Sequence, residues 1–407
     1  MRYLINLSIL RRNRNFAYLF SGQFISFMGT MITGVALPYQ IYMETRSTMM
    51  VGLLSLAQLL PLLVTALIGG VFADRYHRKF LLFSAEAILA GGSVILAMNA
   101  TLPVPSISVM FIVAAIMSAF NGLHRPALDS MVQQVVAKED YPAVSSLGTF
   151  KFSIGMILGP AIGGLVIAHY GLVATYLLDF MSFGLSLCAL LLMSHIPKPS
   201  NVVDESTLAS IMKGFRYAVS RQELMGTYLV DFIAMVFGMP TALFPAIALS
   251  FGGPEQLGLL YAAPAVGALG VAIFSGWARD VKRHGRAIAI AATLWGFAMI
   301  GFGLAPYYGL ALLFLAIAGG FDAISGIFRS IMWNETIPNN IRGRMAGIEM
   351  ISYLSGPKLG DTEAGLVAAA FGITTSIVSG GILCVAGVAV CCISLPKFWS
   401  YRSTPHG

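Results

Sequence analysis

Long apolar runs recur along the whole chain and constrain its fold more than any other feature. A helix needs roughly 20 apolar residues to cross the hydrocarbon core of a bilayer. We count twelve runs of about that length. Barrel strands would alternate in hydropathy over about 10 residues, and these runs do not alternate. The sequence therefore predicts an all-α membrane protein with helices at 16–40, 49–73, 80–99, 105–134, 143–168, 172–195, 224–249, 256–277, 287–305, 309–334, 343–371 and 372–395.

The distribution of basic residues predicts how these helices are oriented. Most of the 25 Lys and Arg residues fall in one alternate set of loops, and the opposite loops hold only Arg46. Under the positive-inside rule this places both termini in the cytoplasm. The net charge of +7 thus reflects topology and does not indicate nucleic-acid binding. The basic N-terminal stretch leads directly into a spanning run, so no cleavable signal peptide is expected.

A hydrophilic segment divides the helices into two sets of six. We expect an N-terminal six-helix bundle at 1–195, a cytoplasmic linker at 196–222 and a C-terminal six-helix bundle at 223–407. Residues 208–219 of the linker have the pattern of a short amphipathic helix lying at the membrane interface. Halves of equal helix count predict a pseudo-symmetric internal repeat.

Two short loops carry that repeat. Each has a glycine, an aspartate four residues later and a basic cluster, and the second copy lies 206 residues after the first. The first copy contains Gly70, Asp74, Arg75 and Arg78, and the second contains Gly276 and Asp280. A glycine there lets a neighbouring helix approach closely, and an aspartate can face a helix N-terminus.

These loops resemble the signature loop of the major facilitator superfamily. His77 stands where that family has glycine, and the second copy lacks an arginine directly after Asp280. The resemblance implies two six-helix bundles, a substrate cavity between them, alternating access and a monomer. It also implies that the two loops, with Gly70, Asp74, Arg75, Arg78, Gly276 and Asp280, act as the conformational gate.

Small residues at four-residue spacing mark the fifth predicted helix: Gly155, Gly159, Pro160, Gly163 and Gly164. Such spacing allows close helix packing, and proline kinks a helix. This string resembles the helix-5 motif of major facilitator exporters that work as antiporters, which implies export. A general packing face is the alternative interpretation.

Residues 349–371 read as the second-half copy of this motif. Gly356, Pro357 and Gly360 match Gly159, Pro160 and Gly163, and Gly365-Leu-Val matches Gly164-Leu-Val. Lys358 replaces an alanine, and four residues, Asp361 to Ala364, are inserted. Four residues are close to one helical turn, so the insertion keeps the helical phase beyond it.

Ionisable side chains inside apolar runs are expensive and usually face a cavity or a partner. Burial raises the proton affinity of a carboxylate, and a nearby cation lowers it, so such a group can take up and release a proton. Fixed ion pairs, such as Lys358 with Asp361, are the alternative. Glu86, Asp129 and Lys151 also fall in these runs. Our candidates for proton coupling are Asp322, first of all, and Asp179, Asp231, Glu349 and Asp361.

Polar and aromatic residues in the same runs predict a substrate cavity for a polar, acidic and fairly large molecule. The candidates for this cavity are Gln23, Tyr39, Gln40, Asn121, Arg125, Arg329, Tyr353 and Lys358. A pump for lipophilic cations would have acids and aromatics with few buried cations.

Several short stretches resemble the enterobactin-exporter branch of the superfamily, among them Val35-Ala-Leu-Pro-Tyr-Gln-Ile41 and Gly258-Leu-Leu-Tyr-Ala-Ala-Pro264. The resemblance implies a protein of the bacterial inner membrane that performs proton-coupled antiport of a siderophore, or a similar acidic metabolite, from cytoplasm to periplasm. A broad-specificity multidrug/proton antiporter is the alternative. The sequence shows no enzyme-like nucleophile and base, and the four cysteines fall in apolar runs without metal-ligand spacing. We therefore expect no enzyme, cofactor or metal site.

Overall fold

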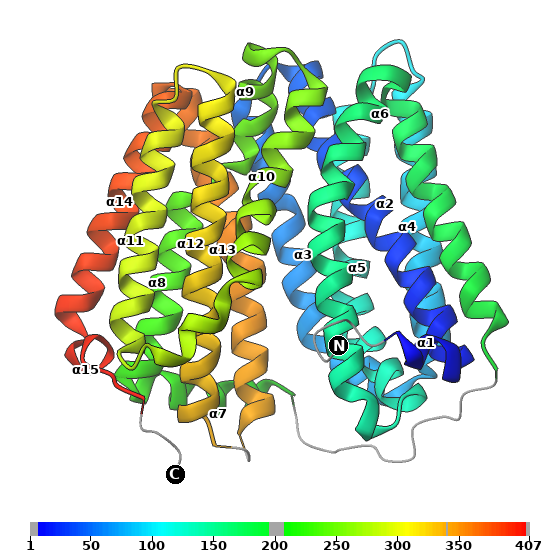
Figure 1. Cartoon of the computed structure of the whole chain (residues 1–407). Coiled ribbons are helices and arrows are strands. Elements are labelled where there is room, and N and C mark those ends of the chain that lie inside the picture. Colours follow the sequence, from blue (N-terminus) through cyan, green and yellow to red (C-terminus); the bar gives the residue numbers. More distant parts are fainter. Residues whose placement is uncertain (1–6, 195–206, 339–340, 404–407) are drawn as a thin grey trace. The chain divides into compact units, whose positions relative to one another are not determined.

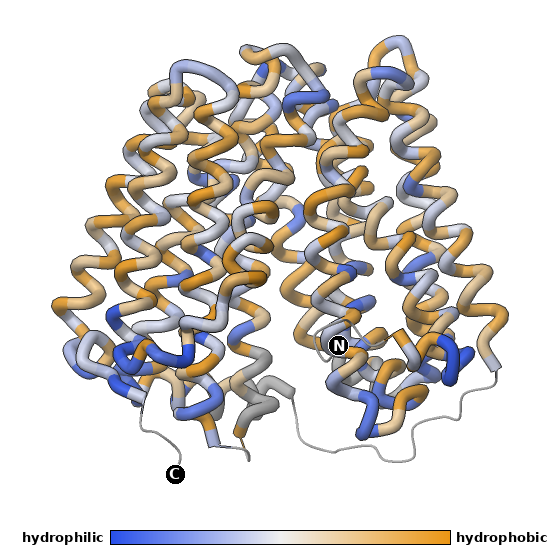
Figure 2. The backbone as a smooth tube through the Cα atoms, viewed as in Figure 1, coloured by the Kyte–Doolittle hydropathy of each residue, from blue (hydrophilic) through white to orange (hydrophobic). Residues whose placement is uncertain are grey.

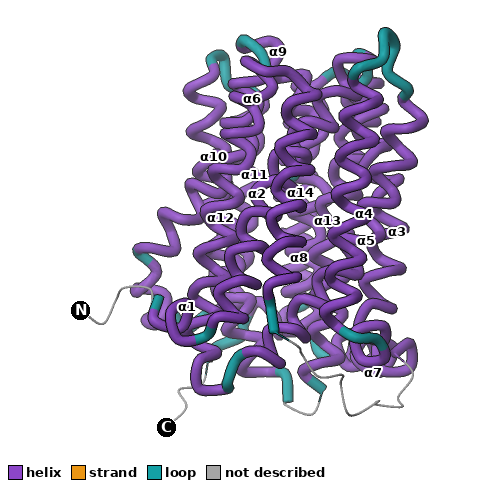
Figure 3. The backbone as a smooth tube through the Cα atoms, turned by 90° about the vertical axis from the view of Figure 1, so that its right-hand side faces the viewer, coloured by secondary structure: helices purple, strands orange, loops and turns teal. Residues whose placement is uncertain are grey.

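The computed structural model describes residues 7–194, 207–338 and 341–403, and within them every regular element is helical (Figures 1 and 3). The first half contains α1 (Ser8–Arg12), α2 (Arg14–Thr45), α3 (Thr48–Arg75), α4 (Arg78–Ala100), α5 (Ile107–Val135), η1 (Lys138–Asp140) and α6 (Tyr141–Leu192). The second half contains α7 (Thr207–Ser220), α8 (Gln222–Gly238), η2 (Thr241–Leu243), α9 (Phe244–Phe251), α10 (Pro254–Ile273), η3 (Ser275–Asp280), α11 (His284–Gly303), α12 (Tyr308–Thr336), α13 (Arg342–Phe371), α14 (Ile373–Ser394) and α15 (Pro396–Trp399).

Ten of the helical segments in the described part of the chain are long and apolar enough to cross a membrane. One of them, 138–192, holds two of the predicted spans. Helix α13 is not among the ten, because its charges lower its hydropathy, but its 30 residues are ample for a span. The all-α membrane fold is confirmed, and the arrangement is consistent with twelve spanning helices. Helix α7 also agrees with the amphipathic helix predicted at 208–219.

Helix α6 is interrupted where the sequence predicts the boundary between two spans. Gly171 has φ 78° and ψ 177°, a conformation that residues with a Cβ atom rarely adopt. Thr175 bonds back through its hydroxyl to the Gly171 carbonyl at 2.8 Å and supports the first turn of the second span. The predicted helices 143–168 and 172–195 are thus the two arms of α6.

The seventh predicted span, 224–249, is broken near its middle. Helix α8 ends at Gly238, a 3-10 turn (η2) follows at Thr241–Leu243, and α9 continues to Phe251. Pro240 at the junction has no backbone N–H, so it cannot donate a helical hydrogen bond. A broken span inside a membrane needs other partners for its free backbone groups.

Contacts divide the chain into two units. Unit 1 comprises 1–45, 57–204 and 252–262, and unit 2 comprises 46–56, 205–251 and 263–407. In unit 1, α2 and α4 pack against α6, and α5 packs against α4, around a core that includes Leu19, Leu82 and Met131. In unit 2, α8, α11, α13 and α14 pack on one another, with α12 beside α11 (Figure 1).

The outward surfaces of both units are apolar along the helices. Leu60 in unit 1 and Ile393 in unit 2 have 69% and 82% of their side chains exposed. Hydrophilic residues gather in the loops and at the helix ends (Figure 2). An exposed apolar surface of this extent is explained by a lipid surround.

Glycine contacts support the predicted repeat and its inserted turn. A Cβ atom at Gly159 would collide with the Met31 side chain, and one at Gly356 would lie 2.8 Å from Met235 Cβ. Farther along, a Cβ at Gly164 would lie 2.9 Å from Gly258 Cα, and one at Gly365 would lie 2.9 Å from Gly52 Cα. The two contact points are five residues apart in α6 and nine apart in α13. Helix α13 therefore contains one additional turn, 361–364, between equivalent contacts.

Candidate transport site

An arginine with two acids forms the strongest charged cluster in unit 2. Arg329 of α12 makes an ion pair with Asp231 of α8, and its Nη2 lies 3.4 Å from Asp322 Oδ1. Asp322 and Arg329 are seven residues apart, so they lie on one face of α12. Arg329 and Asp231 are nearly buried, with 11% and 14% of their side chains exposed, whereas Asp322 has 43% exposed. We call these three residues the Arg329 cluster.

The Arg329 cluster carries an excess of negative charge. One guanidinium faces two carboxylates, and Glu349 of α13, exposed, adds its field at Arg329. The planar fork of arginine suits a carboxylate pair better than a lysine would. With Asp322 ionised the three residues sum to one negative charge, and with Asp322 protonated they sum to zero.

Trp333, one turn beyond Arg329 on α12, forms an aromatic pair with Tyr228 of α8. The rings of Trp333 and Tyr228 stack with centroids 5.2 Å apart. Trp333 Nε1 donates to Thr227 Oγ1 at 2.8 Å, which fixes the indole on α8. Tyr353 of α13, another predicted cavity residue, is exposed. Unit 2 thus holds an acid, a cation and fixed aromatic faces within about three turns of α12.

Asp361, the first residue of the added turn in α13, is held by neutral donors. Its carboxylate accepts hydrogen bonds from Thr241 Oγ1 at 2.5 Å, Ala242 N at 2.8 Å and Ser55 Oγ at 2.9 Å. Two of these donors belong to the turn that breaks the α8–α9 span. The added acid therefore accepts from a backbone N–H that the break leaves without a helical partner, and from the neighbouring Thr241 hydroxyl. Lys358, half-buried one turn earlier, is electrostatically attracted to Asp361.

Asp179 occupies the centre of unit 1 and also has neutral partners. Thr33 Oγ1 of α2 and Ser93 Oγ of α4 each donate to its Oδ2 at 2.7 Å. Ser182 Oγ lies 3.5 Å from Oδ1, and the side chain is fully buried. Among the described residues no cation pairs with Asp179, so hydroxyls alone solvate it.

A second buried acid of unit 1, Glu86, was not among our candidates. Gln23 of α2 donates to its Oε1, and His124 Nε2 of α5 lies 3.3 Å from the same oxygen. The other oxygen, Oε2, is buried and has no partner in the described part of the chain. His124 was missed because a lone histidine in an apolar run has no distinguishing pattern. The pairing of the third and fourth spans would have brought it to Glu86.

The other cavity candidates of unit 1 differ in their burial and in their hydrogen-bond or ion-pair partners. Gln40 is buried and accepts a hydrogen bond from Tyr176 at 2.7 Å, and its neighbour Tyr39 is buried as well. Asn121 bonds to its own helix at Met117 O. Arg125, exposed, pairs with Asp129 at 3.4 Å.

The small residues of the antiporter-type string pack on α2. Gly155 faces the Phe27 ring, and Gly163 faces Ile32. Lys151 Nζ lies 5.7 Å from the centre of the Phe27 ring, which stacks with Phe152. Lys151 thus lies over an aromatic ring, and the exposed Arg125 of α5 is near enough to interact with it electrostatically. Together they give unit 1 a cationic and aromatic surface.

The structure describes the second predicted gate loop more completely than the first. Gly70 and the side chains of Asp74 and Arg75 lie outside the described residues. Arg78 Nη1 donates to Ser130 O at 3.0 Å and joins α4 to α5. In the second loop, Asp280 lies 3.9 Å from Arg279, both exposed, and Gly276 has open space around it.

The family model described as "Transmembrane secretion effector" matches residues 7–406. The chain belongs to this family. It is a multi-pass inner-membrane transporter of the major facilitator superfamily, and not an enzyme.

Known proteins are similar to this chain along almost its whole length. The enterobactin exporter EntS of Escherichia coli O81 (strain ED1a) is 30% identical over 406 residues, 99% of this chain and 97% of the relative. EntS of Escherichia coli O139:H28 (strain E24377A / ETEC) shows the same identity and coverage. A bacterial homolog of the human lysosomal transporter Spinster has a TM-score of 0.77 at 14% identity, covering 96% of this chain and 98% of that one. The nucleoside transporter NupG has a TM-score of 0.72 at 16% identity, covering 94% and 99%. Both structures share the major facilitator fold.

Proposed function

We propose that this transporter exports a siderophore of the enterobactin type, from cytoplasm to periplasm, in exchange for protons. Asp322 carries this proposal, because it is a half-exposed carboxylate tied to Arg329. The EntS relatives support the substrate class. The small-residue string that includes Gly159 and Pro160 supports exchange. The one-sided distribution of basic loops supports cytoplasmic termini.

The coupling follows from hydrogen-bonding capacity. An ionised carboxylate only accepts hydrogen bonds, and protonation turns one oxygen into a donor. The hydroxyls of a catechol are donors, so they bind the ionised form of Asp322 and are displaced when it is protonated. Proton and substrate then weaken each other's binding at one residue. A site that binds either the proton or the substrate, and that opens first to one side of the membrane and then to the other, exchanges the two.

The charge of the Arg329 cluster favours a catechol over a carboxylate siderophore. With Asp322 ionised the cluster is negative, and a substrate carboxylate would be repelled by it. Hydroxyl donors are attracted instead. The stacked pair of Tyr228 and Trp333, one turn beyond Arg329 along α12, offers aromatic faces to the rings of a large catechol substrate.

The test uses the full-length protein, working as a monomer, in liposomes. We expect Asp322→Asn to abolish enterobactin exchange driven by a pH gradient, while the variant still binds enterobactin, because an amide keeps one acceptor. Wild-type protein should bind enterobactin more weakly at about pH 6 than at about pH 8, and Asp322→Asn should bind equally at both. Asp140→Asn, which removes an exposed acid paired with Arg12, is the matched control. Gradient-driven exchange that survives in Asp322→Asn would overturn the assignment.

Cells provide a second test, which separates the two substrate classes. Deletion of the gene should leave siderophore inside iron-starved cells, and wild-type protein should restore secretion. Unchanged secretion, together with raised sensitivity to several dyes and macrolides, would instead identify a multidrug/proton antiporter.

A further inference from the structure

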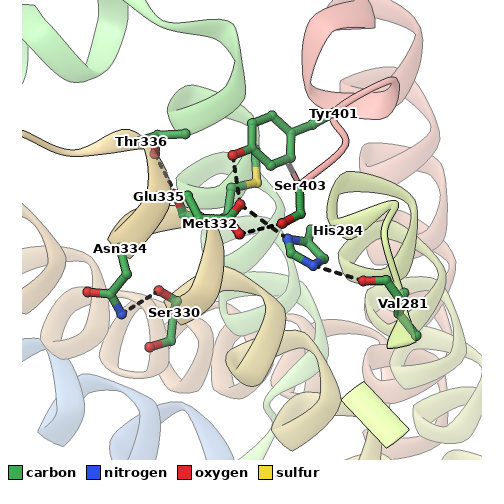
Figure 4. A network of polar contacts seen from close by, with 9 residues as sticks. All are labelled: Val281, His284, Ser330, Met332, Asn334, Glu335, Thr336, Tyr401 and Ser403. Carbon is green, nitrogen blue, oxygen red and sulfur yellow. Dashed lines mark hydrogen bonds and ion pairs between the residues drawn. The ribbon is translucent and has the colours of Figure 1, made fainter. Parts of the chain in front are cut away.

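The C-terminal residues are fastened to the loop between η3 and α11. Ser403 N donates to Lys282 O at 2.9 Å, and Ser403 Oγ donates to Glu335 Oε1 at 2.5 Å. Tyr401 Oη donates to Glu335 Oε2 at 2.9 Å, and His284 Nδ1 lies 3.7 Å from that oxygen (Figure 4). Phe398 is fully buried. The segment is therefore held at fixed positions on both sides of Arg402.

This fastening gathers three arginines at one end of unit 2. Arg283 and Arg286 come from the loop and first turn of α11, and Arg402 comes from the fastened segment. The guanidinium of Arg286, followed by that of Arg402, lowers the pKa of the fully exposed Arg283 by charge repulsion. Arginine stays charged in proteins, so the fold holds three cations together at an electrostatic cost.

No acid in the described part of the chain neutralises these arginines. Glu335 is engaged by Tyr401, Ser403 and His284. Asp280 is the partner of Arg279. The Nε atom of Arg286 is buried and has no hydrogen-bond acceptor among the described residues. Three neighbouring cations without an acidic partner point to an anionic ligand from outside the chain.

The surroundings identify that ligand as part of the bilayer. Arg286 lies over the Trp399 ring, with 5.2 Å between Cζ and the ring centre, and tryptophan is enriched at membrane–water interfaces. From Arg286 an exposed apolar face continues along α11 at helical spacing through Ile290, Leu294 and Phe297. A soluble anion would make no use of such a face, whereas acyl chains would cover it.

We propose that Arg283, Arg286 and Arg402, beside Trp399, bind the headgroup phosphates of an anionic phospholipid whose acyl chains lie along Ile290, Leu294 and Phe297. This site does not depend on the transported substrate or on proton coupling.

The test places full-length protein in phosphatidylcholine bilayers and titrates brominated phosphatidylglycerol, which quenches tryptophans that it touches. The quenching that is lost in Trp399→Phe reports this site. We expect its midpoint to lie at a several-fold lower mole fraction for brominated phosphatidylglycerol than for brominated phosphatidylcholine. Arg283→Gln and Arg286→Gln should each raise the midpoint about five-fold, since a basic residue at an anionic surface contributes ~1 kcal/mol.

Arg279→Gln is the matched control, because it removes an arginine of the neighbouring turn η3 that already has Asp280 as its partner. Arg286→Lys keeps the charge and should recover most of the affinity lost in Arg286→Gln, which guards against misfolding as the explanation. An equal effect of Arg279→Gln, or equal midpoints for the two lipids, would overturn the proposal. Binding of inorganic phosphate in detergent as strong as that of phosphatidylglycerol would assign the arginines to a soluble anion and would also overturn it.

Discussion

Asp179 of unit 1 and Asp231 of unit 2 are both acids inside membrane-spanning helices, yet their partners differ. Asp179 is surrounded by the hydroxyls of Thr33, Ser93 and Ser182. Asp231 is paired with the nearly buried Arg329. Hydroxyls serve either charge state of a carboxylate, since each can rotate to donate or accept. A buried guanidinium instead requires a charged partner. The two aspartates are therefore stabilised by different chemistry.

Asp361 separates the effect of the partner from the effect of the unit. It lies in unit 2, as Asp231 does, but its hydrogen-bond donors are neutral, as those of Asp179 are. If the partner decides how an acid tolerates neutralisation, Asp361 should behave like Asp179.

The largest effect is expected from Arg329→Gln. Removing the cation leaves two carboxylates close together without a counter-charge, and breaking a buried ion pair costs about 3–5 kcal/mol. Unfolding in mixed detergent micelles should show that loss, and transport should cease. Arg12→Gln, which breaks the exposed pair with Asp140, should lose less than about 1 kcal/mol.

The double variant Asp231→Asn with Arg329→Gln should recover most of that stability, because it removes both charges, but it should not recover transport. Equal stability of Arg329→Gln and Arg12→Gln would show that the Arg329 cluster is not a buried ion pair.

An intermediate effect is expected at Asp361. Asp361→Ala leaves three donors unpaired, at about 1 kcal/mol or more each. Asp361→Asn keeps an acceptor for Thr241 and Ala242 and should lose about 1 kcal/mol. The same unfolding assay measures both. A loss in Asp361→Asn as large as that in Arg329→Gln would show that location within unit 2, and not the partner, sets the cost.

The smallest effect is expected from Asp179→Asn. The amide keeps one acceptor, and a hydroxyl can rotate to accept from its NH₂ group, so we expect a loss of about 1 kcal/mol or less. Asp179→Leu removes the acceptors and should lose more, because the buried hydroxyls of Thr33 and Ser93 both lose the oxygen to which they donate. Equal losses in the two variants would contradict the hydrogen-bonding account.

Much of the fold could be predicted because the bilayer imposes it. Twelve apolar runs define the spans, and Gly171 lies at the predicted boundary inside α6. The added turn in α13 was also predictable, since two copies of one motif could be compared. The break at Pro240 was not predicted, because a proline is tolerated inside spanning helices when neighbours satisfy the backbone.

Less of the candidate site could be predicted, because apolar runs do not show which way each helix is turned. The pairing of Asp231 with Arg329 depends on the rotation of α8 relative to α12. The same holds for Glu86 and His124, and for Gln40, whose partner Tyr176 lies 136 positions away. Charge inside a span indicates that a partner is needed, but tertiary packing decides which one.

The added turn of α13 has a consequence for how the protein is made. Helix α13 is the only long helix of the described second half that falls outside the ten apolar spans, and its acid finds donors on α3 and η2. Those donors emerge from the ribosome well before Asp361 does. During synthesis α13 must therefore enter the bilayer against helices already inserted, instead of partitioning alone into lipid. Substitution of Ser55 or Thr241 would then first reduce the amount of protein that is correctly inserted into the membrane.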